Sequence, residues 1–300
     1  MTVAPRAVVV YRRTELDELL ERHGTRSQAA FFLRQRGQSL DDVTARHEAQ
    51  TDALAQVAAV IPLEWRRGLV ERHDLDRFLF GPEDVVVAVG QDGLVANVAK
   101  YLDGQIVIGI DPEPGHNPGL LVRHATASAG SLLKLAIGPR GADNVEVRSM
   151  VEAVTDDGQT LLAVNEIFVG HRSHQSARYQ ISAPDCSEAS ERQSSSGLLV
   201  GTGTGATGWC RSVWQERGSD LPLPQPEELR LCWFVREAWP SPTTGTKCTE
   251  GILGSDEELS LVAESDLVVF GDGIESDAVS LTWGQSIRLR LAPRHLHLLT

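Results

Sequence analysis

Residues 84–93, DVVVAVGQDG, decide the fold of the chain, because an apolar run ends there in a short turn that carries one carboxylate. Five of the first six residues are apolar and four are valine, which predicts a strand covered on both faces of a parallel sheet. Gly90 and Gly93 permit backbone angles and a close ligand approach that other residues do not. The next segment, LVANVAKYL, predicts a helix whose free N–H groups point at the turn and favour an anion.

Asp92 lies between the two glycines, where a carboxylate could act as a base beside a bound anion. Gly-x-Asp-Gly also forms ordinary structural turns. The motif by itself therefore leaves both a structural and a catalytic function open.

The composition is that of a soluble globular protein, with 41% hydrophobic and 23% charged residues. The net charge of -13 disfavours non-specific binding to nucleic acid or anionic membrane, which depends on clustered Lys and Arg. The four cysteines form no C-x-x-C pair, which predicts reduced thiols rather than a zinc site or a disulfide framework. We find no export signal and no apolar span of about 18 residues, so we expect a cytoplasmic protein without a membrane anchor.

Alternating strand and helix patterns predict an α/β domain with a parallel sheet over residues 1–125. Ligands of such sheets bind outside the carboxyl ends of the strands, which is where the turn at Gly90 lies. The expected strands are 7–11, 85–89 and 105–110, and the expected helices are 14–23, 39–61 and the segment after Gly93.

Short β segments from residue 126 onward predict a β-rich second domain over residues 126–283, and residues 284–300 could return to the first domain. A polar, serine-rich stretch at 186–196 and a Pro/Thr/Gly-rich stretch at 240–249 are expected to be surface loops.

A second polar element, GTGTGATGW at 201–209, follows an apolar strand and offers three threonine hydroxyls among glycines. Such a loop suits phosphate, ribose hydroxyls or an adenine edge. A Gly/Thr-rich turn before a helix is the structural alternative. The element is neither a Walker A loop nor a dinucleotide fingerprint within a βαβ unit.

A third element is the polar pair Asn165-Glu166 inside the apolar segment TLLAVNEIFVG. Such groups are costly to bury unless they are hydrogen-bonded. Asn165 suits an adenine edge, and Glu166 suits ribose hydroxyls. A bulge or a strand end at Asn165 is the alternative.

In chain order, GQDG at 90–93, NE at 165–166 and SSGLLVGTGTGATGW at 195–209 resemble the successive motifs of the NAD kinase family. The family pattern is Gly-Gly-Asp-Gly, then Asn-Glu, then a Thr-Gly-rich segment. RHEAQTDAL at 46–54 and GIDPEPGHNPG at 109–119 resemble the mitochondrial and plant NADH-kinase branch in particular. The resemblance spans nearly the whole chain.

This resemblance implies a kinase, a transferase that moves the terminal phosphoryl group of ATP to the 2'-hydroxyl of the adenosine ribose of NAD or NADH. It implies Mg2+ or another divalent cation held through the phosphates, and a homo-oligomer such as a homodimer. The implied fold is an α/β domain and a β-rich domain with the substrate between them. Asp92 would be the general base, and Gly90, Gln91 and Gly93 would hold the donor phosphates.

The other motif residues would bind the dinucleotide. The resemblance places Asn165 and Thr204 at adenine, Glu166 at ribose hydroxyls and Ser196 near the nicotinamide end. The pocket would also be lined by Thr207, Gly208 and Trp209.

Three residues near the donor loop depart from the family pattern: Gln91 replaces a glycine, Leu94 a threonine and Asp111 an asparagine. If position 91 requires a positive φ, glutamine there costs about 1 kcal/mol. Asp111 adds negative charge near an anionic ligand. Two interpretations remain open. The chain is an active kinase for a dinucleotide or another hydroxyl acceptor such as a nucleoside or sugar, or it is a catalytically degenerate NAD(P)(H)- or nucleotide-binding member of the family.

Overall fold

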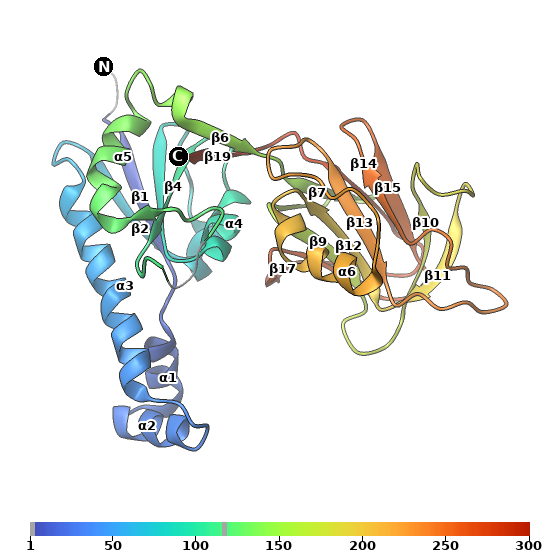
Figure 1. Cartoon of the computed structure of the whole chain (residues 1–300), viewed down its shortest axis with the longest axis horizontal. Coiled ribbons are helices and arrows are strands. Elements are labelled where there is room, and N and C mark those ends of the chain that lie inside the picture. Colours follow the sequence, from blue (N-terminus) through green and yellow to red (C-terminus); the bar gives the residue numbers. More distant parts are fainter. Residues whose placement is uncertain (1–3, 116–118) are drawn as a thin grey trace. The chain divides into compact units, whose positions relative to one another are not determined.

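The computed structural model describes residues 4–115 and 119–300, which divide into two compact units (Figure 1). The first unit comprises Met1–Glu146 with His297–Thr300, and the second comprises Val147–Leu296. The helices are α1 (Glu15–His23), α2 (Arg26–Arg34), α3 (Leu40–Val60), α4 (Asp92–Ala99), α5 (Ala129–Ala136) and α6 (Trp209–Arg217).

The strands of the first unit are β1 (Arg6–Tyr11), β2 (Arg66–Glu71), β3 (Asp84–Val89), β4 (Ile106–Asp111), β5 (His124–Ala125), β6 (Val145–Arg148, which crosses into the second unit) and β19 (Leu296–Leu299). The strands of the second unit are β7 (Val151–Thr155), β8 (Thr160–Ala163), β9 (Glu166–Gly170), β10 (Ala177–Ser182), β11 (Glu191–Ser195), β12 (Gly197–Thr202), β13 (Leu231–Arg236), β14 (Glu250–Leu253), β15 (Glu258–Ala263), β16 (Leu267–Gly271), β17 (Ile274–Leu281) and β18 (Ser286–Leu291).

The sheet of the first unit runs in the order β2-β1-β3-β4-β19-β6, with β5 paired to β4. β3 pairs in parallel with β1 and β4, and all of its residues are buried. The valine run is therefore an interior strand covered on both faces, as the sequence predicts. The expected α/β unit with a mostly parallel sheet, followed by a β-rich unit, is confirmed.

The first three helices begin at side-chain caps. Thr14 and Asp17 form a capping box at the start of α1, and Ser39 caps α3. Figure 1 shows α1 and α2 beside the N-terminal part of α3, where a small apolar cluster joins the three helices. α4 begins at Asp92 rather than after Gly93, because the amide of Leu94 already donates to the Gln91 carbonyl at 2.8 Å.

The division between the units falls after Glu146, not at residue 125. α5 belongs to the first unit because Leu132 and Leu133 pack into the core formed by the parallel sheet. The chain returns to this sheet only at its last residues, where β19 pairs in parallel with β4.

The second unit is built from antiparallel strands in two sheets, among the residues that the structure describes. The sheet orders are β11-β10-β15-β18-β7-β8 and β14-β13-β12-β9-β16-β17. Val151 and Tyr179 of the first sheet share one core with Ile167 and Trp233 of the second, so the sheets pack face to face. α6 covers the outer face of the second sheet, where its apolar side chains contact Phe168 and Phe234.

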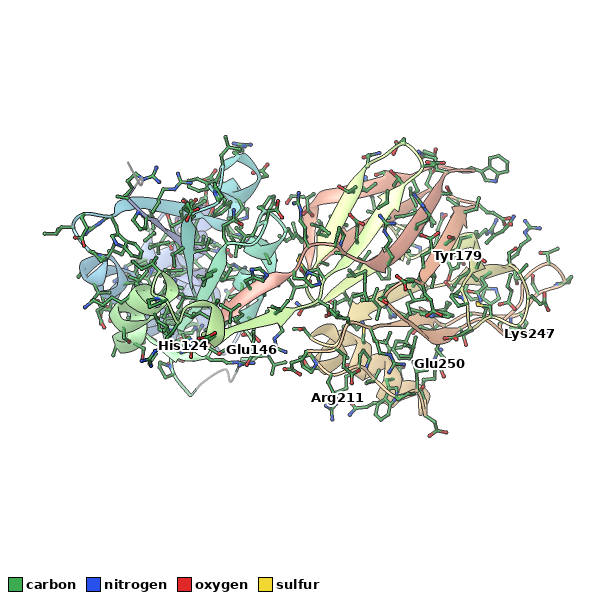
Figure 2. All side chains as sticks on the ribbon, turned by 90° about the horizontal axis from the view of Figure 1, so that it is seen from above. His124, Glu146, Tyr179, Arg211, Lys247 and Glu250 are labelled. Atoms are coloured by element: carbon green, nitrogen blue, oxygen red, sulfur yellow. A yellow bond between two sulfur atoms is a disulfide. The ribbon has the colours of Figure 1, made fainter. Side chains whose placement is uncertain are left out.

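Part of the stretch expected as a surface loop, 186–196, is a buried strand. β11 pairs with β10, and Gln193 and Ser195 are almost wholly inaccessible to solvent. Tyr179, which Figure 2 labels, shares a 2.7 Å hydrogen bond between its hydroxyl and that of Ser195. The expectation is wrong for β11, because hydrogen bonds allow these polar side chains to be buried.

The cysteines also differ from expectation. Cys186 and Cys248 form a disulfide, whereas Cys210 and Cys232 are free and buried. The prediction of four reduced thiols is therefore wrong for the first pair. Their sequence separation of 62 residues gives no sign of pairing. Glu191 holds the backbone at Cys248, since its carboxylate accepts hydrogen bonds from the amides of Lys247 and Cys248.

None of the helices in the described ranges combines the length and the apolar character needed to cross a membrane.

Candidate active site

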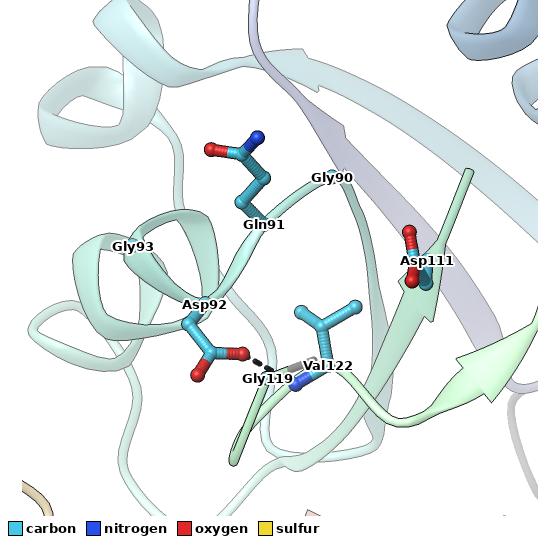
Figure 3. Close-up of a pocket in the computed structure, with 7 residues that line it drawn as sticks. All are labelled: Gly90, Gln91, Asp92, Gly93, Asp111, Gly119 and Val122. Carbon is cyan, nitrogen blue, oxygen red and sulfur yellow. Dashed lines mark hydrogen bonds between the residues drawn. The ribbon is translucent and has the colours of Figure 1, made fainter. Parts of the chain in front are cut away.

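The turn between β3 and α4 opens onto a pocket of about 240 Å³ (Figure 3). The turn is fixed from two sides. The amide of Gly90 donates to the Ile110 carbonyl on β4 at 3.0 Å, and the Gln50 side chain on α3 donates to the Val89 carbonyl at 2.8 Å. The pocket is lined by Gly90, Gln91, Asp92, Gly93, Asp111, Gly119 and Val122.

Asp92, the predicted base, is held by three backbone amides of the loop after β4. The amide of Leu120 donates to its Oδ2 at 2.7 Å, and those of Leu121 and Val122 donate to its Oδ1 at 3.0 and 2.8 Å. A carboxylate oxygen has about two lone-pair positions. Within the described residues, Oδ1 is therefore fully used and Oδ2 retains one acceptor position.

Gly119 allows this close approach of the loop to the carboxylate. A Cβ atom at this position would lie 2.1 Å from Oδ1 of Asp92 and 2.8 Å from its Cγ. Only glycine fits there without displacing the Asp92 side chain.

Gln91 has an extended backbone, with φ -105° and ψ 168°. The cost expected for a left-handed glutamine is therefore not incurred. In Figure 3 its side chain points away from Asp92. Neither Gly90 nor Gly93 has a positive φ, and a Cβ on Gly93 would meet nothing within 4 Å among the described atoms. Gly93 therefore contributes open space to the pocket rather than an unusual backbone angle.

Asp111, at the end of β4, places a second carboxylate on the pocket. Its Oδ1 accepts from the amide of Glu113 at 2.9 Å. An anionic ligand beside two carboxylates would be repelled unless a cation lay between them. Residues 116–118 of the adjoining segment, which resembles the NADH-kinase branch, lie outside the described residues.

Within the described ranges, no three or more His, Cys, Asp and Glu side chains are grouped so that they could hold a metal ion. A divalent cation at this pocket would therefore have to take part of its coordination from a ligand such as a phosphate chain.

In the second unit, the polar pair Asn165-Glu166 lies at the break between β8 and β9. The Asp272 carboxylate accepts hydrogen bonds from the amides of Val164 at 2.8 Å and Asn165 at 2.7 Å. These bonds replace sheet pairing at the break. The structural alternative, a strand end at Asn165, is thus correct. Asn165 and Glu166 are also half-buried polar groups, so a binding function remains compatible with the strand end.

Glu166 is the first residue of β9 and lies opposite Gly201 of β12. Burial, and secondarily the negative charge of Asp272, raise the pKa of Glu166 to about 7. Its carboxyl group therefore changes charge near neutral pH.

The GTGTG segment is tied to this pair through Thr202. The Thr202 hydroxyl donates to the Val164 carbonyl at 2.5 Å and accepts from the amides of Thr204 and Gly205 at 3.1 and 3.2 Å. The hydroxyl oxygen of Thr204 is buried and has no hydrogen-bond partner in the described structure. Thr204 thus retains hydrogen-bonding capacity beside Asn165 and Glu166.

Replacing Gly205 by alanine should separate these two segments, because a Cβ there would lie 2.1 Å from the backbone oxygen of Asn165. A rigid backbone cannot yield as a side chain can, so we expect unfolding free energy to fall by about 1–3 kcal/mol. Denaturant unfolding measures the loss. Gly254→Ala is the matched control, because its nearest neighbour is the flexible side chain of Glu257. Equal stability of both variants would contradict this packing argument.

The other residues predicted to bind the dinucleotide lie either at the start of α6 or before β12. The Thr207 hydroxyl donates to the Thr204 carbonyl at 2.8 Å, and Gly208 precedes α6. Trp209 stacks on Phe168 with ring centroids 5.6 Å apart, and the Arg236 guanidinium lies 5.4 Å from its ring centroid.

Ser196 lies at the other end of β12, where its amide donates to the Arg236 carbonyl at 2.8 Å. At about 3.4 Å per residue, the length of β12 separates Ser196 from Thr202. The structure thus groups Asn165, Glu166 and Thr204 and leaves Ser196 apart from them.

Sequence reasoning missed the contacts that hold these residues. The amides of residues 120–122 carry no side-chain signal. The sequence also does not distinguish Thr202 from the neighbouring threonines of the GTGTGATGW segment. Asp272 is followed by Gly273, a pair that is typical of a turn but does not reveal the hydrogen-bond partners of the carboxylate.

An α/β unit with a carboxylate turn, followed by a β-rich unit with Asn-Glu and Gly/Thr-rich segments, is the arrangement that the resemblance to NAD kinases implies. No family model matches the chain. The chain is 28% identical over 258 residues to the mitochondrial NAD kinase 2 of Rattus norvegicus, covering 69% of this chain and 60% of that protein. It thus spans less than two thirds of that relative's length.

Among solved structures, the fold matches the crystal structure of an NAD kinase from Archaeoglobus fulgidus in complex with ATP. The TM-score is 0.59 at 18% sequence identity, and the match covers 98% of this chain and 93% of the other. The resemblance to the NAD kinase family is therefore confirmed in sequence by one relative and in fold by the other.

Proposed function

We propose that the chain is an ATP-dependent NAD(H) kinase that phosphorylates the 2'-hydroxyl of the adenosine ribose of NAD or NADH. The observation that carries this proposal is the Asp92 carboxylate, held rigidly beside a pocket with one acceptor position left on Oδ2. The names of both relatives, and the ATP bound to the archaeal protein, support the same reaction.

The donor side of the reaction belongs to the first unit in this proposal. Gly90, Gln91 and Gly93 surround the pocket with backbone groups, and the N-terminus of α4 favours negative charge there. ATP would bring Mg2+ on its phosphates, and Asp111 could contact that cation. Positioning and charge neutralisation supply most of the catalysis in phosphoryl transfer.

Asp92 would act on the attacking hydroxyl. Its free acceptor position on Oδ2 would take the proton as the ribose oxygen bonds to the terminal phosphorus and the bond to the leaving ADP oxygen breaks. The three amide bonds would keep the carboxylate in place through this step.

The acceptor side belongs to the second unit. Thr204 and Asn165 would contact adenine, and Glu166 would accept bonds from ribose hydroxyls. Ser196, at the far end of β12, would lie near the nicotinamide. The rest of the pocket would be formed by Thr207, Gly208 and Trp209. We also propose a homodimer in the cytoplasm; the rat relative is named as mitochondrial.

A turnover assay tests the proposal. Purified protein with ATP and Mg2+ should convert NAD or NADH into NADP or NADPH, measured by a dehydrogenase specific for the phosphorylated cofactor. Adenosine and glucose serve as alternative acceptors in parallel reactions. Product from these acceptors alone would indicate a different kinase. NAD binding by calorimetry without any ATP turnover would indicate a catalytically degenerate binding protein.

A further inference from the structure

We infer that Asp272 is a positioning residue that holds the backbone before Glu166 and sets the pH range in which Glu166 can bind ribose hydroxyls. The inference rests on the proposed function of the Asn165-Glu166 pair. Asp272 follows β16, which pairs antiparallel with β9 and places Gly271 opposite Ile167. The turn after β16 therefore lies beside the start of β9.

The contacts between the turn and β9 run in both directions. The Asp272 carboxylate accepts from the amides of Val164 and Asn165 at 2.8 and 2.7 Å, and its own amide donates to the Glu166 carbonyl at 3.2 Å. These three bonds fix the backbone on both sides of the Asn165 side chain. Loss of the carboxylate would leave two amides without these acceptors at the strand break.

The backbone of Asp272 is unusual for a residue with a side chain, because its φ is 53°. Glycine adopts this region freely, and Gly273 beside it does so at φ 67°. Asp-Gly is also a preferred pair for a two-residue hairpin turn of this kind, which here joins β16 to β17. The turn directs the Asp272 carboxylate to the amides of Val164 and Asn165, from which it accepts its two hydrogen bonds.

The same carboxylate acts on Glu166 electrostatically. Burial is the main cause and the Asp272 charge the second cause of the rise in the pKa of Glu166 to about 7. β12 presents Gly201 opposite Glu166, and α6 contributes the buried thiol of Cys210. The pKa of Cys210 is raised by its hydrogen bond with Cys232 and by burial, so this thiol stays neutral and adds no charge near pH 7.

The sign of the pH effect follows from these groups. The folded protein keeps the Glu166 proton between about pH 4.5 and 7, where the unfolded chain has lost it, so Glu166 lowers stability as pH rises through that window. The affinity for ribose hydroxyls changes in the opposite direction, because the ionised carboxylate accepts with both oxygens and forms stronger hydrogen bonds, whereas protonation turns one oxygen into a donor. With a pKa of about 7, the ionised fraction rises about tenfold from pH 6 to pH 8.

The first experiment needs no ligand. The carboxyl carbon of Glu166 is titrated by NMR and assigned by its absence in Glu166→Gln. We expect a midpoint near pH 7 in the unchanged protein. In Asp272→Asn the midpoint should fall by about one pH unit, because asparagine tolerates the left-handed backbone but carries no charge. Asp266→Asn, an exposed change in the same unit, should leave the midpoint unchanged.

The second experiment measures NAD+ affinity by calorimetry from pH 6 to pH 8. Affinity should rise about tenfold in the unchanged protein, should not rise in Glu166→Gln, and should rise at lower pH in Asp272→Asn. Asp272→Gly relieves the backbone and removes the carboxylate. If Asp272→Asn does not fold, Asp272→Gly must show the lowered midpoint together with weaker binding.

The outcomes separate the two proposals. A midpoint unaltered in both Asp272 variants overturns the inference and leaves the kinase proposal standing. If the Glu166 midpoint shifts as expected in the Asp272 variants but the protein binds no NAD+ at any pH, then Glu166 does not bind ribose, and this part of the proposed function is overturned.

Discussion

Replacing Asp92 by asparagine is expected to lower kcat for NAD phosphorylation by about 100-fold or more, since a positioned general base contributes about 10²–10⁴-fold. Asparagine keeps one oxygen, which can serve the amides of Leu121 and Val122. Its NH2 group then faces the amide of Leu120, which in the unchanged protein donates to Oδ2 of Asp92 at 2.7 Å. That amide loses its acceptor, and unfolding free energy should fall by about 1–3 kcal/mol.

Steady-state kinetics and denaturant unfolding separate the two effects. Asp42→Asn makes the same chemical change at an exposed position in the first turn of α3, so it should leave both quantities near their original values. A stability loss without any loss of kcat would mean that Asp92 organises the loop but does not take the proton. Unchanged kcat and stability would contradict both roles.

The sequence predicted the supporting strand of this site well, because its signal is local. The valine run of β3 is apolar at every position after Asp84, which indicates burial without knowledge of any neighbour. The helix starts at Thr14 and Ser39 could be predicted equally well, since a capping side chain bonds to amides only two or three residues ahead. The ordered motifs located Asp92, Glu166 and Thr204 for the same reason: side-chain type and spacing are visible in the chain.

The contacts that hold Asp92 and Glu166 could not be predicted from the sequence, because they involve backbone amides far away along the chain. The loop at 120–122 is separated from Asp92 by about 30 residues, and Asp272 lies more than 100 residues from Asn165. Any residue except proline carries the amide that such a bond requires. Gln91 shows the opposite case. Its identity suggested strain that its extended φ of -105° removes, because only the folded backbone fixes that angle.

Replacing Gly119 by alanine is expected to lower kcat/KM by about 100-fold, although the change adds one methyl group outside the donor turn. The new Cβ would lie 2.1 Å from Oδ1 of Asp92, so the carboxylate has to move by more than 1 Å to restore an ordinary contact. A misplacement of about 1 Å in a catalytic group can cost about 10²-fold. The Asp92 side chain itself is retained in this variant, so the base is displaced rather than removed.

Gly130→Ala is the matched control, because its Cβ would meet Val60 at an ordinary 3.4 Å and alanine favours the helix α5. Kinetics of Gly119→Ala alone and combined with Asp92→Asn complete the test. If Gly119 acts through Asp92, the double variant should be little worse than Asp92→Asn, since a displaced base and a missing base lose the same step. Full additivity of the two losses would mean that Gly119 serves the pocket in another way, and unchanged kcat/KM in Gly119→Ala would show that the position of Asp92 does not limit the reaction.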